Sequence, residues 1–460
     1  MKILIENHIV KIANIEIGGQ NPIVAQSMTN TNTLDTQASV NQIIELVNAG
    51  SKIVRLTCRS IKEAENLKNI KELLIKNEIR IPLVADTHFS PAVAEAAAVY
   101  ADKVRINPGN YIDKRRQKSK FTEEEHKEEL IKIRGKLGRL IEICEENSTA
   151  VRIGVNHGSL SERMLFRYGN TARGMYESAM EFIKIFRELN FHNLVISLKA
   201  SYVPTMMEAN KLLHDEMHKK GFYYPIHLGV TEAGDGEEAR VKSAAGIGSL
   251  LAEGIGDTIR VSLTENPIEE IPFADKLIEI YGKRQTLPMP YYELNRTSKP
   301  QIILKYNSHD EEELLINSSV DFTRLNESGL YKKLKIITNG EPKNELSDII
   351  LQALGIKYSK AEFIACPSCG RTLFNIIDEL KKVKQKTSHL KGLKIAVMGC
   401  IVNGIGEMAD ADYGYVGAGA GKVNLYKQKQ IISKNINESL AVDELIKIIK
   451  ENGDWKLETE

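Results

Sequence analysis

The chain has 460 residues, of which 42% are hydrophobic and 27% charged, as is ordinary for a soluble globular protein of two or three domains. Its 62 basic and 61 acidic side chains give a net charge of +1, so composition offers no argument for a nucleic acid or an anionic membrane as partner. Five cysteines, no long apolar run and no signal or transit peptide after Met1 predict a cytoplasmic enzyme.

From residue 20 to about residue 285, short runs rich in β-branched residues alternate with amphipathic segments of helix length. Eight runs are candidate strands, namely residues 22–27, 52–57, 81–86, 103–107, 151–156, 193–199, 225–230 and 258–263. Such repeated strand–helix alternation predicts a (β/α)8 TIM barrel, a fold of typically about 250 residues.

Basic side chains stand in or at the end of five of these strands, where barrels place their active sites. They are Arg55, Arg105, Arg152, Lys199 and Arg260. Barrel strands are covered on both faces, so these cations should not lie on the solvent-exposed surface. Together they predict a binding site for phosphate or diphosphate. For any single cation the alternative is an ion pair with a barrel carboxylate such as Asp86 or Glu232.

Two segments depart from the alternation. Residues 111–147 carry a dense charged run followed by a helical period, which predicts a long connection that ends in a solvated helix. Residues 282–355 contain candidate strands at 301–306 and 333–338 and a short helix at 345–354. They read as a small inserted module of no evident function.

From residue 361 onward we expect a compact α/β unit. It should contain a helix at 372–384, a strand at 392–398, two paired strands at 413–416 and 422–426, and a closing helix at 442–451. The predicted domains are therefore a barrel over residues 1–285, a linker or inserted module over 286–355, and a cysteine-bearing domain over 356–460.

Three cysteines in this last unit predict a metal centre. Cys366 and Cys369 are three positions apart, Cys400 follows 31 positions later, and thiolates are soft ligands for iron–sulfur clusters or zinc. Three thiolates leave one corner of a four-iron cluster open, which a catalyst can use for substrate. Glu407, on a glycine-rich loop, is the best further ligand and should be displaceable. A structural zinc site and a thioredoxin-like redox pair stay open as alternatives.

These motifs carry a family resemblance. The segments Ala365-Cys-Pro-Ser-Cys-Gly-Arg-Thr372 and Gly399-Cys-Ile-Val-Asn-Gly404 resemble the iron–sulfur domain of the 4-hydroxy-3-methylbut-2-enyl diphosphate synthase family. The barrel resembles the same family at residues 26–31, 105–110, 152–156 and 228–234. The resemblance covers most of the chain outside residues 111–147 and 282–355.

The resemblance implies an oxidoreductase of the methylerythritol phosphate pathway of isoprenoid biosynthesis. It would open 2-C-methyl-D-erythritol 2,4-cyclodiphosphate reductively to (E)-4-hydroxy-3-methylbut-2-enyl diphosphate, with loss of water. Two electrons would enter through a 4Fe-4S cluster from reduced ferredoxin or flavodoxin. Cys366, Cys369 and Cys400 would bind three irons, and Glu407 would cap the fourth until substrate displaces it.

The resemblance also implies the residues that hold the substrate. They would be Arg55, Asp86, Arg105, Arg152, Asn156, Lys199, Arg260 and Ser262. Glu232 and Glu407 are both candidates for the catalytic acid or base, and nothing in the sequence decides between them.

The chain departs from the family pattern in two places. Ile405 stands where the family usually has proline, which should loosen the loop that bears Glu407. Residues 282–355 look like a reduced version of the extra domain in plant and chlamydial relatives. We expect a homodimer, and the sequence leaves open whether the C-terminal domain closes on its own barrel or on that of the partner.

Two rival functions stay open as alternatives. The first is a zinc-stabilised scaffold that binds a phosphorylated metabolite without chemistry, in which Glu407 would not matter. The second is a radical-type iron–sulfur lyase, which usually carries a Cys-x3-Cys-x2-Cys run that this chain lacks.

Overall fold

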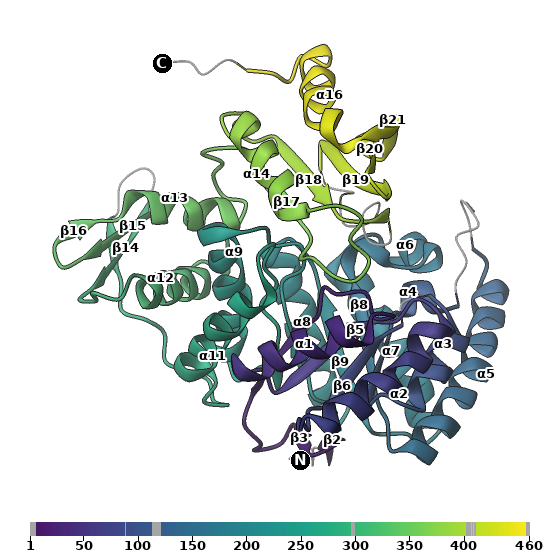
Figure 1. Cartoon of the computed structure of the whole chain (residues 1–460). Coiled ribbons are helices and arrows are strands. Elements are labelled where there is room, and N and C mark those ends of the chain that lie inside the picture. The colour runs from purple at the N-terminus through teal and green to yellow at the C-terminus, as the bar shows by residue number, and fades with distance from the viewer. Residues whose placement is uncertain are drawn as a thin grey trace.

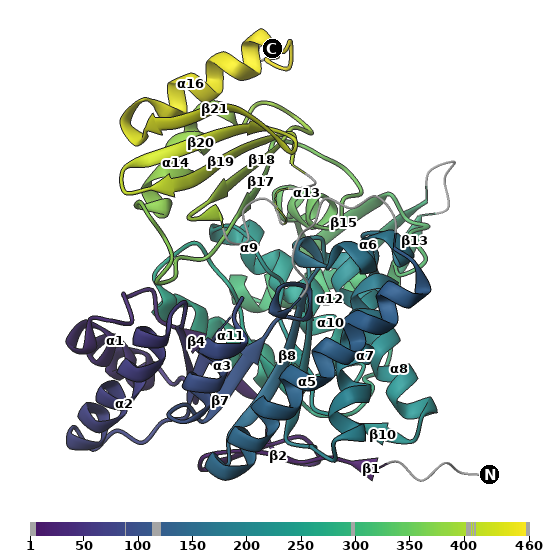
Figure 2. The same ribbon diagram turned by 90° about the vertical axis from the view of Figure 1, so that its right-hand side faces the viewer.

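The computed structural model of the chain describes residues 6–87, 89–112, 121–295, 300–401, 406, 408 and 411–456. It shows a parallel barrel, a module packed against its side, and a C-terminal unit that lies over one end of the barrel (Figures 1 and 2).

The predicted eight-stranded barrel is confirmed. Its strands are β4 (Val24–Met28), β5 (Ile53–Thr57), β6 (Leu83–Asp86), β7 (Lys103–Ile106), β8 (Ala150–Asn156), β9 (Leu194–Lys199), β11 (His227–Leu228) and β12 (Thr258–Ile259). They are parallel neighbours in the order β11-β12-β4-β5-β6-β7-β8-β9. An isolated bridge between Ile196 and Ile226 joins β9 to β11, so the sheet closes on itself. The last two strands are shorter than predicted.

Helices surround the barrel, and polar side chains fix where several of them begin. They are α1 (Thr36–Asn48), α2 (Ile61–Lys76), α3 (Pro91–Ala98), α4 (Pro108–Tyr111), α5 (Glu123–Asn147), α6 (Glu162–Tyr168), α7 (Ala172–Glu188), α8 (Val203–Lys219), α9 (Gly236–Ser243), α10 (Ser249–Ala252) and α11 (Glu270–Tyr281). Asp35 and Ser60 accept hydrogen bonds from first-turn amides of α1 and α2. Thr122 and Glu125 form a capping box at the start of α5. No helix among the described residues has the length and apolarity needed to span a bilayer.

A hairpin seals the end of the barrel opposite the C-terminal unit (Figure 1). Strands β2 (Val10–Ile12) and β3 (Ile15–Ile17) pair antiparallel, and their side chains pack into a fully apolar cluster with the barrel interior. The barrel residues of this plug are Ile53, Val84, Ala150 and Val195, all buried. Beside it, β1 (Glu6–Asn7) pairs with β10 (Phe222–Tyr223). The barrel interior is therefore closed at the end opposite the C-terminal unit.

The inserted module is a small α/β layer on the flank of the barrel (Figure 1). Its sheet has β13 (Glu293–Asn295), β14 (Gln301–Tyr306), β15 (Lys333–Thr338) and β16 (Glu341–Pro342), and its helices are α12 (Glu311–Leu325) and α13 (Asn344–Ala353). Strand β13 lies where a linker was expected. Val320 and Phe322 of α12 belong to the same buried core as the barrel helices. The boundaries at residues 285 and 355 stay a prediction.

The C-terminal unit is a mixed five-stranded sheet with its own core. Its strands are β17 (Glu362–Ala365), β18 (Lys394–Met398), β19 (Tyr413–Gly419), β20 (Lys422–Lys427) and β21 (Gln430–Asn437), with helices α14 (Ile376–Thr387) and α16 (Glu438–Glu451). β17, β18 and β19 are parallel, whereas the last three strands are antiparallel. Helix α14 begins four residues later than predicted, because the cysteine turn continues to Asn375, whose side chain caps the helix.

The contact between α12 and the barrel gives a stability prediction. A Cβ added at Gly248 would lie 2.6 Å from Cγ2 of Val320, in a fully buried place. Gly248→Ala should therefore lower the free energy of unfolding by about 1–3 kcal/mol through overpacking. The measurement is the midpoint of urea denaturation.

Gly135 on the exposed face of α5 is the matched control, because a Cβ there would meet nothing within 4 Å. Gly135→Ala should leave stability unchanged or raise it by about 0.5–1 kcal/mol. Equal midpoints for the two variants would contradict the packing described between α12 and the barrel.

Candidate active site between the barrel and the C-terminal unit

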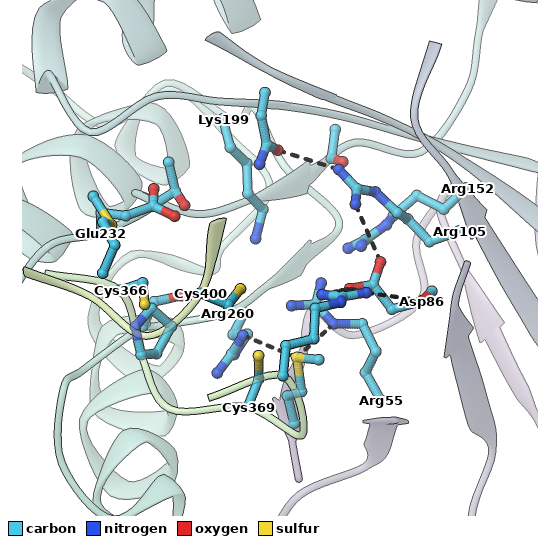
Figure 3. A pocket seen from close by; sticks show the side chains of 18 residues that line it. Arg55, Asp86, Arg105, Arg152, Lys199, Glu232, Arg260, Cys366, Cys369 and Cys400 are labelled. Carbon is cyan, nitrogen blue, oxygen red and sulfur yellow. Dashed lines mark hydrogen bonds and ion pairs between the residues drawn. The ribbon is translucent and has the colours of Figure 1, made fainter. Parts of the chain in front are cut away.

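One pocket of about 80 Å³ lies between the barrel mouth and the cysteine turn (Figure 3). Every predicted site residue except Glu407 lines it, namely Arg55, Asp86, Arg105, Arg152, Asn156, Lys199, Glu232, Arg260, Ser262, Cys366, Cys369 and Cys400. Glu407 falls outside the described residues. The pocket also contains Met28, Ser197, Thr231, Pro367, Arg371 and Met398.

The register of the barrel strands brings the polar side chains together. Asp86 pairs with Arg105 across β6 and β7, and Arg105 pairs with Arg152 across β7 and β8. Asn156 pairs with Lys199 across β8 and β9. Residues two apart on a strand face the same side, so these positions point into the barrel while their apolar neighbours face the helices.

Two glycines make room for the long cations. A Cβ at Gly154 would lie 2.4 Å from Nε of Arg105, and a Cβ at Gly229 would lie 2.5 Å from Nζ of Lys199. Any other residue at either place would displace the charged group. Glycine at these two positions therefore leaves the space that the side chains of Arg105 and Lys199 occupy.

Two of the five cations are held by acids. Arg105 donates from Nη1 to Oδ1 of Asp86 at 3.1 Å and from Nη2 to the carbonyl oxygen of Gly154 at 2.8 Å. Arg260 binds Glu270 through two hydrogen bonds, of 2.9 and 3.1 Å. Glu270 is buried, and it begins α11 rather than a strand. Because Glu270 lies on a helix, no strand pattern pointed to it as a site residue.

The other three cations are less well neutralised. Arg55 donates from Nε to the sulfur of Met28 at 3.0 Å, and burial lowers its pKa to about 10. Burial also lowers the pKa of Arg152 and Lys199 well below their usual values, and neighbouring cations lower it further. An anion in the pocket would relieve this repulsion, because opposite charge favours the charged forms.

The three thiols come from loops that follow parallel strands. Cys366 follows β17, and Cys400 comes two residues after β18. Sγ of Cys366 accepts a hydrogen bond from the amide of Gly399 at 3.2 Å. Burial raises the pKa of Cys366 well above its usual value, and the thiols of Cys400 and Cys369 raise it further. Within the described ranges, no three Cys, His, Asp or Glu side chains are grouped so as to hold a metal ion.

Arg371 links the cysteine turn to the barrel. It donates from Nη1 and Nη2 to Oδ2 of Asp86, both at 3.2 Å, and from Nη2 to the carbonyl oxygen of Asp86 at 3.1 Å. Asp86 thus binds Arg105 with one carboxylate oxygen and Arg371 with the other. Arg371 stands two residues after Cys369, and that position in the cysteine motif was the only sequence signal for it.

A seam of direct contacts holds the C-terminal unit on the barrel. Ala233 forms a parallel bridge with Ala365, and Thr264 donates from Oγ1 to the carbonyl oxygen of Ala365 at 3.2 Å. Lys242 of α9 lies 3.3 Å from a carboxylate oxygen of Glu362. Glu232, next to the bridge, is 2% exposed and has a φ of 50°, a strained conformation for this residue type. Strain of this kind is concentrated at functional sites.

Comparison with known proteins agrees with this picture. The family model described as the GcpE TIM-barrel domain matches residues 7–275, and the GcpE protein C-terminal domain matches residues 362–451. A Synechococcus sp. protein named 4-hydroxy-3-methylbut-2-en-1-yl diphosphate synthase (ferredoxin) is 46% identical, over 97% of this chain and 94% of its own length. A Gloeothece citriformis protein of the same name is also 46% identical, over 97% of this chain and 92% of its own length.

A longer relative comes from Bacteroides fragilis, where the protein is named 4-hydroxy-3-methylbut-2-en-1-yl diphosphate synthase (flavodoxin). It is 40% identical over 98% of this chain and 96% of its own length. The alignment runs over 601 positions, more than this chain has residues, so that relative carries insertions that this chain lacks. With both of its family models matched and its length covered, this chain belongs to the 4-hydroxy-3-methylbut-2-en-1-yl diphosphate synthase (GcpE) family.

Proposed function

We propose that this chain is an oxidoreductase that opens 2-C-methyl-D-erythritol 2,4-cyclodiphosphate reductively and dehydrates it to (E)-4-hydroxy-3-methylbut-2-enyl diphosphate. One observation carries the proposal: five cations from five barrel strands face three thiols of the C-terminal unit across a single pocket. An anionic substrate held at the mouth would thus lie against a centre built from soft ligands.

The substrate's diphosphate would be held by the barrel. Arg105 and Arg260 are already oriented by Asp86 and Glu270, so little side-chain freedom is lost when they bind an anion. Arg55, Arg152 and Lys199 supply the charge that the barrel itself does not neutralise. Asn156 and Ser262 add neutral hydrogen-bonding groups on the same pocket wall.

The thiols of Cys366, Cys369 and Cys400 fit an iron–sulfur cluster, since all three line the pocket and the Gly399 amide already donates to one sulfur. When bound, a 4Fe-4S cluster supplies electrons one at a time. Arg371 places a positive charge beside Cys369 and Cys400, where it would offset the negative charge of the thiolates. Glu407 is proposed as the fourth, displaceable ligand.

Proton transfer is assigned to Glu232. Its carboxyl group lines the pocket and is buried, and its charge acts on the thiol of Cys366. Its left-handed backbone sits between Thr231 and the bridge at Ala233, which fixes the carboxyl group at the seam. Glu407 stays the alternative acid.

Reduced ferredoxin or flavodoxin is the proposed electron donor, because the relatives are named for one or the other. Closure of the C-terminal unit on its own barrel is supported by the contacts of Arg371 and Ala365, which lie within one chain. Substrate would enter when this seam opens. The homodimer stays a prediction.

Metal content tests the proposal most directly. Protein purified without oxygen should be brown and contain about four irons and four sulfides per chain. Cys400→Ser should lose most of both, because one of the three thiolates is gone. The measurements are the visible absorption spectrum and iron, sulfide and zinc analysis.

Cys144→Ser is the matched control, because that thiol belongs to the buried face of α5 and lies outside the pocket. It should keep the full iron content. Colourless protein with about one zinc per chain would overturn the reductase and leave a zinc-bearing scaffold with an anion-binding barrel.

Glu270 gives a prediction about turnover. Glu270→Gln keeps the shape of the side chain but removes the carboxylate that holds Arg260 by two hydrogen bonds. Losing a charge-assisted contact of this kind costs about 1.5–3 kcal/mol, so kcat/KM should fall about 10- to 100-fold. The assay follows conversion of the cyclodiphosphate with a chemical one-electron reductant.

The neighbouring Glu269 is exposed and serves as the control. Glu269→Gln should retain the activity of the unmodified protein. Unchanged activity in Glu270→Gln, with the iron content intact, would remove Arg260 from the proposed diphosphate site.

A further inference from the structure

A second group of polar side chains lies inside the barrel beneath the pocket. Gln26 and Lys103 stand two residues before Met28 and Arg105, which line the pocket, and so face the interior one step deeper. His227 stands two residues before Gly229, where an added Cβ would lie 2.5 Å from Nζ of Lys199, another pocket residue. We call these three residues and Arg152 the inner cluster. All four are at most 2% exposed.

The inner cluster is short of partners. Both amide atoms of Gln26, Nζ of Lys103, Nε and Nη1 of Arg152, and Nε2 of His227 have no hydrogen-bond partner in the part of the chain that the structure describes. Buried polar groups of native proteins are nearly always paired. Because these unpaired polar groups lie together in one place, they indicate a functional site.

In the part of the chain that the structure describes, no acid forms an ion pair with the inner cluster, although the charge of Asp86 acts on Arg152. Below it lies the apolar plug formed by the β2–β3 hairpin. Above it lie Arg55, Arg105, Lys199 and Arg260, together with the acids Asp86, Glu270 and Glu232. Asp86 binds Arg105 and Arg371, Glu270 binds Arg260 and Ser27, and Glu232 lies at the seam.

The charges that act most strongly on the two titratable members are all positive. For Lys103 they belong to Arg152 and Arg55, and for His227 to Lys199, Arg152, Lys103 and Arg55. Burial lowers the pKa of Lys103 and of His227 well below their usual values, and these cations lower both further. With no anion in the mouth, burial and these cations thus favour the neutral form of both groups.

We propose that Lys103 and His227 form a proton-binding site under the diphosphate site, which takes up additional protons when a diphosphate enters the barrel mouth. The inference rests on the diphosphate ligand of the proposed function and adds to it a proton that the protein binds together with that ligand.

The hydrogen bonds of His227 support this role. Its Nδ1 lies 2.5 Å from Oγ1 of Thr258, which is itself completely buried. In the tautomer that donates its Nδ1 hydrogen to that hydroxyl, Nε2 carries a lone pair and accepts the incoming proton. Neutral Lys103 likewise carries one lone pair on Nζ. Neither change needs a new cavity, since a proton adds no volume.

The diphosphate supplies the driving force. Its negative charge above the inner cluster favours the protonated form of every basic group nearby. Arg55, Arg105, Arg152 and Arg260 stay charged throughout and take up nothing. The groups that can take up a proton are therefore Lys103, His227 and, in the barrel mouth itself, Lys199.

Calorimetry tests the inference with inorganic diphosphate as the probe. Titration of the full chain at pH 8 in buffers of different ionisation enthalpy gives the number of protons taken up per bound diphosphate. Lys103→Met and His227→Gln should each lower that number by about half a proton or more. The double variant should lose more than either single one.

Gln26→Met is the matched control. It removes a buried, unpartnered polar group from the same cluster, but that group does not titrate, so proton uptake should equal that of the unmodified protein. The protons that diphosphate itself exchanges are the same in every titration and cancel in the comparison. A purely structural role for Lys103 or His227 would change affinity but not proton uptake.

The outcomes separate this inference from the proposed function. Diphosphate binding with equal proton uptake in all variants overturns the proton site and leaves the diphosphate site standing. No binding of diphosphate by the unmodified protein overturns both. In the unmodified protein the diphosphate affinity should weaken from pH 7 to pH 9 although the ligand becomes more negative, and a flat or rising affinity refutes the inference. If one of the two variants fails to fold, the comparison of proton uptake rests on the other.

Discussion

An excess of buried positive charge is the constraint on which the rest of the site depends. In the described part of the chain, Arg55, Arg152 and Lys199 reach the barrel mouth without an ion pair, whereas Arg260 is bound by Glu270. Burying unpaired charge is costly, so the fold tolerates it only because the hairpin plug and the helices stabilise the barrel elsewhere. The result is a site whose positive charge is balanced by a bound anion rather than by the protein. Such a site selects its ligand by charge before it selects it by shape.

Asp86 ties this constraint to the position of the C-terminal unit. One of its oxygens holds Arg105 of the barrel and the other holds Arg371 of the cysteine turn. The same carboxylate therefore orients a cation of the anion site and fixes the loop that carries Cys369. A buried charge pair of this kind contributes little net stability but imposes a definite geometry, because either partner left alone would be strongly destabilising.

The sequence predicted what depends on strand pattern and spacing, and missed what depends on contacts between distant elements. The five cations and three cysteines were identified because a barrel brings strand ends together and because thiol spacing limits the ligand set. Glu270 was missed since it lies on a helix, and Arg371 since its partner lies 285 positions away. Lys103 and His227 read as ordinary strand residues, because the pattern reveals burial but not which charged groups surround a buried side chain. Strand β13 and helix α12 were missed where apolar periodicity is weak.

The continuous core between the barrel and the inserted module has a consequence for how the chain is made. Val320 of α12 packs against Gly248 in the helical stretch between α9 and α10, so this part of the barrel wall is completed by residues that follow the barrel in sequence. During synthesis the barrel strands emerge from the ribosome first, but this wall stays exposed until α12 has also emerged. The stable barrel therefore requires nearly three-quarters of the chain. Helix α12 must be synthesised before a stable nascent domain exists.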